Sequence, residues 1–111
     1  MEELIELKAK FLKVLADSTR LKIILFLKEG ENTANNIQDV LDKSQSTISQ
    51  QLKSLVENDI LEARRDGVKK YYKVKNPLIF DVISAIDVFL SESKQQKVGD
   101  LTSLDIVDTL H

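Results

Sequence analysis

The sequence predicts a mainly α-helical domain with one β-hairpin, in the order helix, helix, helix, helix, strand, strand, helix. Apolar residues recur at three- and four-residue spacing through most of the chain, which is the period of a helix. Residues 60–74 are instead rich in strand-forming residues and are interrupted by Asp66-Gly67, a strong hairpin signal. A length of 111 residues with 42% hydrophobic composition indicates one ordinary globular domain.

An apolar stripe and a capping signal predict the first two helices. Residues 2–15 read as an amphipathic helix with a wide apolar stripe. Asp17 and Ser18 are good capping residues for the second helix, which ends at Glu29-Gly30. The apolar positions are Leu4, Ile5, Leu7, Phe11, Leu12 and Leu15 in the first helix, and Leu21, Ile24, Leu25 and Leu27 in the second.

A tight turn at Asp42-Lys43 separates two further helices and predicts a helix-turn-helix arrangement. Thr33 caps the third helix, and Ser44 caps the fourth, which runs to about Asn58. The residues expected to face the core are Ala34, Ile37, Val40 and Leu41 in the third helix, and Ile48, Leu52, Leu55 and Val56 in the fourth.

The opposite face of the fourth helix is polar and mostly uncharged. Its hydroxyl and amide groups can donate to and accept from base edges in the major groove of DNA. The alternative is a polar surface without a partner. The candidates for base-edge or sugar-phosphate contacts are Gln45, Ser46, Thr47, Ser49 and Gln50, with Ser44 at the helix N-terminus and Lys53 as phosphate contacts.

The predicted hairpin is basic near its tip, where the chain carries Arg64, Arg65, Lys69 and Lys70. A basic hairpin that follows a helix-turn-helix is a wing, which can hold the DNA backbone or minor groove while a helix lies in the major groove. Charged hairpin tips are also common on solvated surfaces. Tyr72 is expected in the core, because it shares a face with Leu61, whereas Tyr71 could lie on either side.

The charge distribution fits either a polyanionic partner for this part of the chain or a solvated surface that is rich in lysine. The net charge is −2, yet residues 43–75 carry eight Lys and Arg against four Asp and Glu. This window contains the fourth helix and the hairpin. The local field matters more to a polyanion than the total charge does.

The last predicted helix follows Pro77 and is apolar on almost every side. A monomer of this size could not cover such a helix, and large exposed apolar patches mark interfaces. We therefore expect a symmetric homodimer that packs through the first and last helices. The expected interface residues are Leu4, Leu7, Phe11, Ile79, Val82, Ile83, Ile86, Phe89 and Leu90.

Composition argues against several classes of protein. The absence of cysteine excludes disulfides, zinc fingers, iron–sulfur clusters and thiol chemistry. The only histidine is the last residue, His111, and there is no glycine-rich phosphate loop, so we expect no enzyme. The start, Met1-Glu2-Glu3, lacks the pattern of a signal peptide, and the apolar stretch 78–90 is too short for a bilayer. We expect a cytoplasmic protein without a membrane partner.

Three segments together resemble the ArsR/SmtB family of winged helix-turn-helix repressors. They are VLADSTRLKI at 14–23, SQSTISQQL at 44–52 and RRDGVKKYY at 64–72. Ser18 departs from a proline that is usual in the family. The resemblance implies a homodimer that binds a palindromic operator and is released by an inducer.

The resemblance does not extend to the family's usual metal ligands. Thr33 and Asn35 stand at the two cysteine positions of the family's thiol site, and neither is a competent ligand for a soft metal. The family's other site, on the last helix, needs a histidine where Ile83 stands, although Asp81 could supply a carboxylate. We expect no cofactor and no sensing of zinc, arsenic or copper; a hard cation on Asp81 and Asp87 is the weaker alternative.

The predicted organisation is a DNA-binding and dimerisation domain over 1–95 and an acidic amphipathic tail over 96–111. We expect the tail to be an extra packing element; a docking segment or an effector lid is the alternative. The predicted function is a homodimeric, sequence-specific DNA-binding transcriptional regulator, a repressor, with an unknown small-molecule or protein effector left open. The alternatives are a winged-helix protein-interaction module and a nonspecific architectural DNA-binding protein.

Overall fold

The computed structural model describes the backbone of residues 1–98 and the side chains of residues 1–93. The predicted tail therefore lies almost wholly outside the described residues. The chain divides into two compact units, Met1–Pro77 and the part that begins at Leu78. The first unit holds the helix-turn-helix and the hairpin, and the second holds the last helix.

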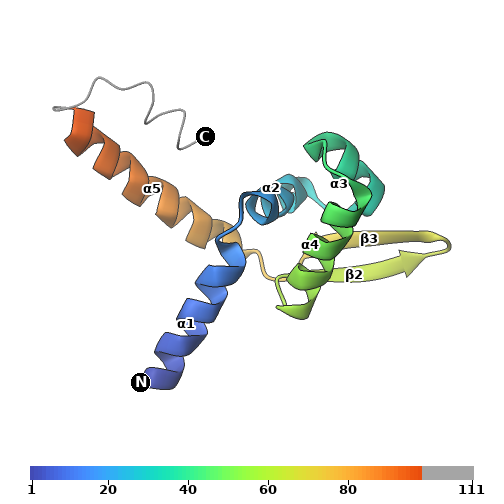
Figure 1. The fold of residues 1–111 in the computed structure, drawn as a ribbon, viewed down its shortest axis with the longest axis horizontal. Coiled ribbons are helices and arrows are strands. Elements are labelled where there is room, and N and C mark those ends of the chain that lie inside the picture. Colours follow the sequence, from blue (N-terminus) through green and yellow to red (C-terminus); the bar gives the residue numbers. More distant parts are fainter. Residues whose placement is uncertain (99–111) are drawn as a thin grey trace. The chain divides into compact units, whose positions relative to one another are not determined.

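The predicted order of elements is confirmed, with one short strand added (Figure 1). The elements of the first unit are α1 (Glu2–Leu15), α2 (Ser18–Phe26), a 3-10 turn (Leu27–Glu29), β1 (Asn32–Thr33), α3 (Ala34–Leu41), α4 (Gln45–Glu57), β2 (Leu61–Asp66) and β3 (Lys69–Val74). The second unit contains α5 (Leu78–Val98), which starts directly after Pro77 as predicted and continues past residue 95. Among the helices of the described part, none is long and apolar enough to cross a bilayer.

Each predicted N-cap is present. The side chain of Asp17 accepts the backbone N–H of Arg20 at 3.0 Å, and the Thr33 hydroxyl accepts that of Asn36 at 3.2 Å. Asp42 adopts the left-handed conformation, with φ of 53°, and ends α3. Helix starts depend on contacts within one turn of chain, which explains why the sequence predicts them well.

The core of the first unit is formed by branched aliphatic side chains from α2, α3, α4 and β2. Its fully buried members are Ile23, Ile24, Ile37, Ile48, Leu52, Leu55 and Leu61. Tyr72 joins them at 9% exposure, as predicted. This core holds α3 and α4 together, so the orientation of α4 is set by its buried stripe.

Val40, which was predicted to face the core, is instead exposed, and so is Leu25, one of the apolar positions of the second helix. Leu25 is 47% exposed and Val40 is 60% exposed, whereas Ile23, which the prediction omitted, is fully buried. The buried arc passes through Ile23 and Ile24 of α2 and continues to Leu27 in the 3-10 turn, and Leu25 lies off that arc. In the eight-residue helix α3 only Ile37 is buried, because so short a helix packs along one narrow line.

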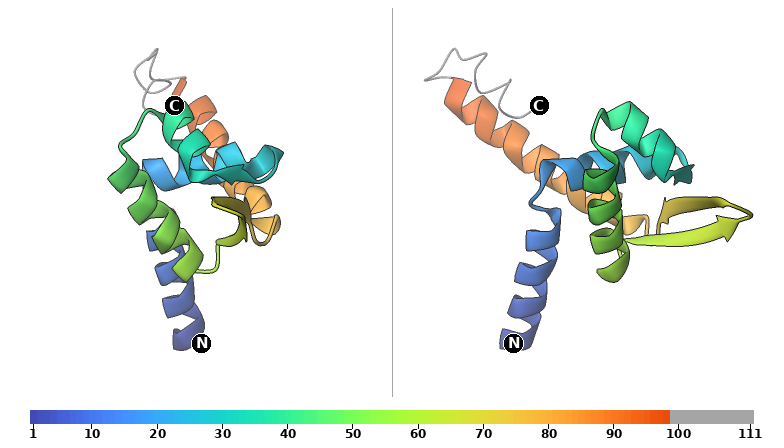
Figure 2. Two further views of the ribbon diagram at one scale, coloured as in Figure 1. Left: turned by 90° about the vertical axis from the view of Figure 1, so that its right-hand side faces the viewer. Right: turned by 45° about the vertical axis from the view of Figure 1, so that its right-hand side comes forward.

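The wing hairpin, β2 and β3, forms a three-stranded antiparallel sheet with β1, in the order β1-β3-β2. β2 and β3 pair from Leu61 with Val74 to Asp66 with Lys69, so the turn is formed by Gly67 and Val68 rather than by Asp66 and Gly67. Gly67 has φ of 65°, which suits a residue without a Cβ atom. In Figure 2 the hairpin extends beyond α4. β1, at two residues, was too short to be predicted from a pattern.

Candidate nucleic-acid interface

The outer face of α4 is exposed as predicted. Ile48 and Leu52 are 1% exposed, and Leu55 is fully buried. The opposite side of the helix carries exposed polar side chains, which are Gln45, Ser46, Ser49, Gln50, Lys53 and Glu57. The helix therefore presents amides, hydroxyls, one ammonium group and, at its last residue, one carboxylate on a face that is free of large apolar side chains.

Two hydrogen bonds between Ser44 and Thr47 cap the N-terminus of α4. Ser44 Oγ accepts the backbone N–H of Thr47 at 3.2 Å and donates to Thr47 Oγ1 at 2.9 Å. Thr47 is half-buried at the helix N-terminus, and its hydroxyl takes part in the cap. The remaining N–H groups of the first turn have no partner within the helix and can meet an anion.

Ser44→Ala is expected to lower the free energy of unfolding by about 1 kcal/mol, because the cap bond to Thr47 is lost. Ser49→Ala is the matched control: it removes a hydroxyl from an exposed position inside the same helix and should leave the stability within about 0.5 kcal/mol. Chemical denaturation monitored by circular dichroism measures both. Equal stability of the two variants would contradict the capping role.

Two adjacent glutamines of α4 have different surroundings. Gln50 is exposed on the outer face. Gln51 is half-buried, and its Oε1 accepts a hydrogen bond from Arg20 Nε at 2.6 Å. Their side chains point in different directions because successive residues of a helix are turned by about 100°. Only Gln50 is available to an external partner without breaking an internal bond.

The four basic residues of the wing divide between its two faces. Arg65 pairs with Lys70 across the strands, on the face that also carries Tyr72. The Lys70 ammonium lies 5.6 Å from the centre of the Tyr72 ring. Because strand side chains alternate, Arg64 and Lys69 lie on the other face. The tip is therefore basic on both sides.

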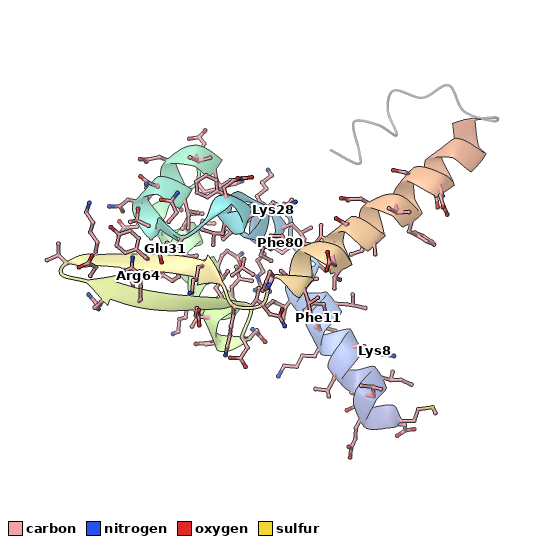
Figure 3. All side chains as sticks on the ribbon, turned by 180° about the vertical axis from the view of Figure 1, so that it is seen from behind. Lys8, Phe11, Lys28, Glu31, Arg64 and Phe80 are labelled. Atoms are coloured by element: carbon pink, nitrogen blue, oxygen red, sulfur yellow. The ribbon has the colours of Figure 1, made fainter. Side chains whose placement is uncertain are left out.

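Arg64 is already paired within the chain. Its guanidinium makes a two-pronged ion pair with Glu31, the residue before β1 (Figure 3). The same guanidinium lies 4.5 Å from the centre of the Tyr71 ring. The hydrogen bonds from Arg64 lower the pKa of the Glu31 carboxyl, and they raise the pKa of Arg64 in turn. Sequence reasoning missed Glu31, because no local pattern links residues so far apart in the chain.

The residues at the family's thiol-site positions do not fit a soft metal. The Thr33 hydroxyl accepts the N–H of Asn36 as a helix cap, and Asn35 is exposed. Both offer neutral oxygen donors, whereas soft metals select thiolates. Among the described side chains, no group of three or more His, Cys, Asp or Glu is placed to hold a metal ion.

Comparisons with known proteins agree with this architecture. The model of the arsR family of bacterial regulatory proteins matches residues 17–63. An arsenical resistance operon repressor of Staphylococcus aureus is 34% identical over 94 residues, which cover 80% of this chain and 90% of the repressor.

Two solved structures share the fold along most of their length. The crystal structure of Rv0081 from M. tuberculosis has a TM-score of 0.79 at 29% identity, covering 86% of this chain and 96% of Rv0081. The homodimeric winged helix-turn-helix DNA-binding domain of Mb0332 from Mycobacterium bovis has a TM-score of 0.72 at 27% identity, covering 82% and 84%. With its helix-turn-helix and wing, the chain is a winged helix-turn-helix transcriptional regulator and belongs to the arsR family of bacterial regulatory proteins.

Proposed function

We propose that the chain is a homodimeric, sequence-specific DNA-binding repressor that recognises a palindromic operator. The exposed face of α4 is the observation that carries the proposal, because Gln45, Ser46, Ser49 and Gln50 are all accessible there. In this proposal α4 lies in the major groove, where amides and hydroxyls read base edges. Lys53 and the N-terminus of α4, with Ser44 and Thr47, contact phosphates.

The wing holds the DNA backbone or minor groove in this proposal. Arg65, Lys69 and Lys70 are its principal contacts, since all three are exposed near the tip. Arg64 has a smaller part, because its ion pair with Glu31 must be broken or shared before it can bind a phosphate.

Exposed apolar side chains support the dimer. On α1, Leu4, Leu7 and Phe11 are 56%, 63% and 37% exposed. On α5, the six predicted interface residues differ in exposure: Phe89 is 68% exposed, and Val82, Ile86 and Leu90 lie between 36% and 40%. Ile79 and Ile83 are each only 7% exposed, so they contribute less new buried area on dimerisation. The homodimeric state of the Mb0332 domain points the same way.

We also propose that release from DNA does not use a thiol or histidine metal site. The S. aureus relative is named for arsenical resistance. In this chain, however, the matching positions hold a helix-capping threonine and an exposed asparagine. An effector of another chemical class, or a protein, would have to supply the signal.

Selection of bound duplexes from a random DNA pool tests the function. The expected result is a palindrome whose half-sites are about 10 base pairs apart, or a multiple of that spacing. Binding without any enriched sequence would support the architectural alternative. If the protein shows no salt-sensitive binding to duplex DNA, the protein-interaction alternative is supported instead.

The salt dependence of binding is expected to separate Arg65 from its neighbour Arg64. Arg65→Gln should lower the slope of log affinity against log salt by about one for each subunit, because one phosphate contact is lost. Arg64→Gln removes the same charge but should change the slope much less, since Glu31 already neutralises that guanidinium. Fluorescence anisotropy over a salt series measures both slopes. Equal changes in the two slopes would show that Arg64 breaks its ion pair with Glu31 and contacts a phosphate when the protein binds DNA.

A further inference from the structure

Arg20 joins three elements of the first unit. Its backbone N–H is held by the Asp17 side chain at 3.0 Å, which places the residue in the first turn of α2. Its Nε donates to Gln51 Oε1 on α4 at 2.6 Å, and its Nη1 donates to the backbone carbonyl of Val14 on α1 at 3.1 Å. The guanidinium therefore bridges the end of α1 and the flank of α4.

The geometry of this bridge requires an arginine. The Val14 carbonyl belongs to the last turn of α1, where carbonyls lack a partner inside the helix. A guanidinium is planar and directs its donors along fixed lines, so that it can serve two acceptors at once. The ammonium of lysine is a point charge on a flexible stem and cannot hold both acceptors in one fixed geometry.

We propose that Arg20 is a positioning residue for DNA recognition, which locks the recognition helix α4 to the dimerisation helix α1 within each subunit. This inference rests on the proposed function. If α1 packs against a second copy and α4 enters the major groove, the bridge fixes how far apart a dimer holds its two recognition helices. Arg20 would then set the half-site spacing that the protein accepts, without contacting DNA.

The spacing preference distinguishes this role from a merely structural one. The experiment uses the full chain, the palindrome selected by the unaltered protein, and the same half-sites with one base pair inserted at the centre. The unaltered protein is expected to favour the selected palindrome by about tenfold or more, since a misplaced half-site loses its base contacts. The measured quantity is the ratio of the two affinities.

Two substitutions of Gln51 form a matched pair. Gln51→Met has a similar volume but no strong acceptor, so it should reduce the spacing ratio several-fold toward one. Gln51→Glu keeps an acceptor oxygen for Arg20 and should keep the ratio, although its negative charge weakens binding to both duplexes alike. Arg20→Lys should reduce the ratio as Gln51→Met does, and combining the two should add little, because they break the same bond.

Lys22→Gln changes the net charge by the same amount as Gln51→Glu, at an exposed position of α2 outside the bridge, and should leave the ratio unchanged. Thermal melting and sedimentation of each variant test whether it is folded and dimeric. If Arg20→Lys does not fold, the comparison of Gln51→Met with Gln51→Glu still tests the proposal. Unchanged ratios in folded Gln51→Met would overturn the role of Arg20 and leave the proposed function intact. Failure of the unaltered protein to prefer any palindrome would instead overturn the proposed function.

Discussion

Phe89→Asp is expected to convert the proposed dimer, of twice 12.6 kDa, into a monomer of 12.6 kDa. Phe89 is 68% exposed on α5, and a buried carboxylate without a partner is far too costly to keep in an apolar interface. A monomer carries one recognition helix and one wing, so it loses the effective concentration that links two half-sites. Operator affinity should therefore fall by about a hundredfold or more.

Sedimentation at micromolar concentration and anisotropy with the selected operator measure these two effects. Ser84→Asp is the matched control, since Ser84 is an exposed polar residue of the same helix and receives the same charge. It should remain dimeric and bind with nearly unchanged affinity. A dimeric Phe89→Asp variant would show that α5 does not form the interface. A monomeric unaltered protein would contradict the proposal that a homodimer presents two α4 helices to one operator.

Gln50→Ala is expected to lower operator affinity by about tenfold or more while leaving the affinity for random duplex DNA nearly unchanged. A bidentate amide contact to a base contributes about 1–3 kcal/mol of discrimination, and a symmetric dimer loses that contact twice. The substitution carries little risk to the fold, because Gln50 is exposed and alanine favours a helix.

Lys53→Ala provides the contrast for Gln50. Lys53 is exposed on the same face of α4, and as a phosphate contact it should weaken binding to operator and random DNA by similar factors. Competition binding with both duplexes separates the two behaviours. Equal losses for Gln50→Ala on the two duplexes would argue that Gln50 does not read bases.

Local signals carried most of the fold prediction. The capping side chains of Asp17, Thr33 and Ser44 each bond a backbone N–H three residues ahead, so a short window of sequence contains the whole interaction. The buried stripe of α4 follows from one helical period, which places Gln50 outward with equal certainty. The turn was misplaced by one residue, because Asp66-Gly67 fits more than one hairpin register.

Contacts between distant segments could not be obtained in this way. The exposure of Leu25 and Val40 depends on which neighbours cover α2 and α3, and an apolar residue does not specify its own neighbour. β1 exists because two residues happen to lie beside β3, and a strand this short has no pattern of its own. The pairing of Arg64 with Glu31 likewise spans 33 positions of sequence.

By itself, the sequence determined the helices, their caps, the hairpin, the face that α4 turns outward and the family resemblance, since all of these depend on neighbours within a few residues or on short motifs. Only the tertiary structure decided which of two adjacent glutamines is free, which wing arginine is already paired, and that Arg20 bridges α1 and α4. The physical reason is that hydrogen bonds and ion pairs of this kind depend on how separate segments pack, and that packing is decided by the whole core rather than by any one segment.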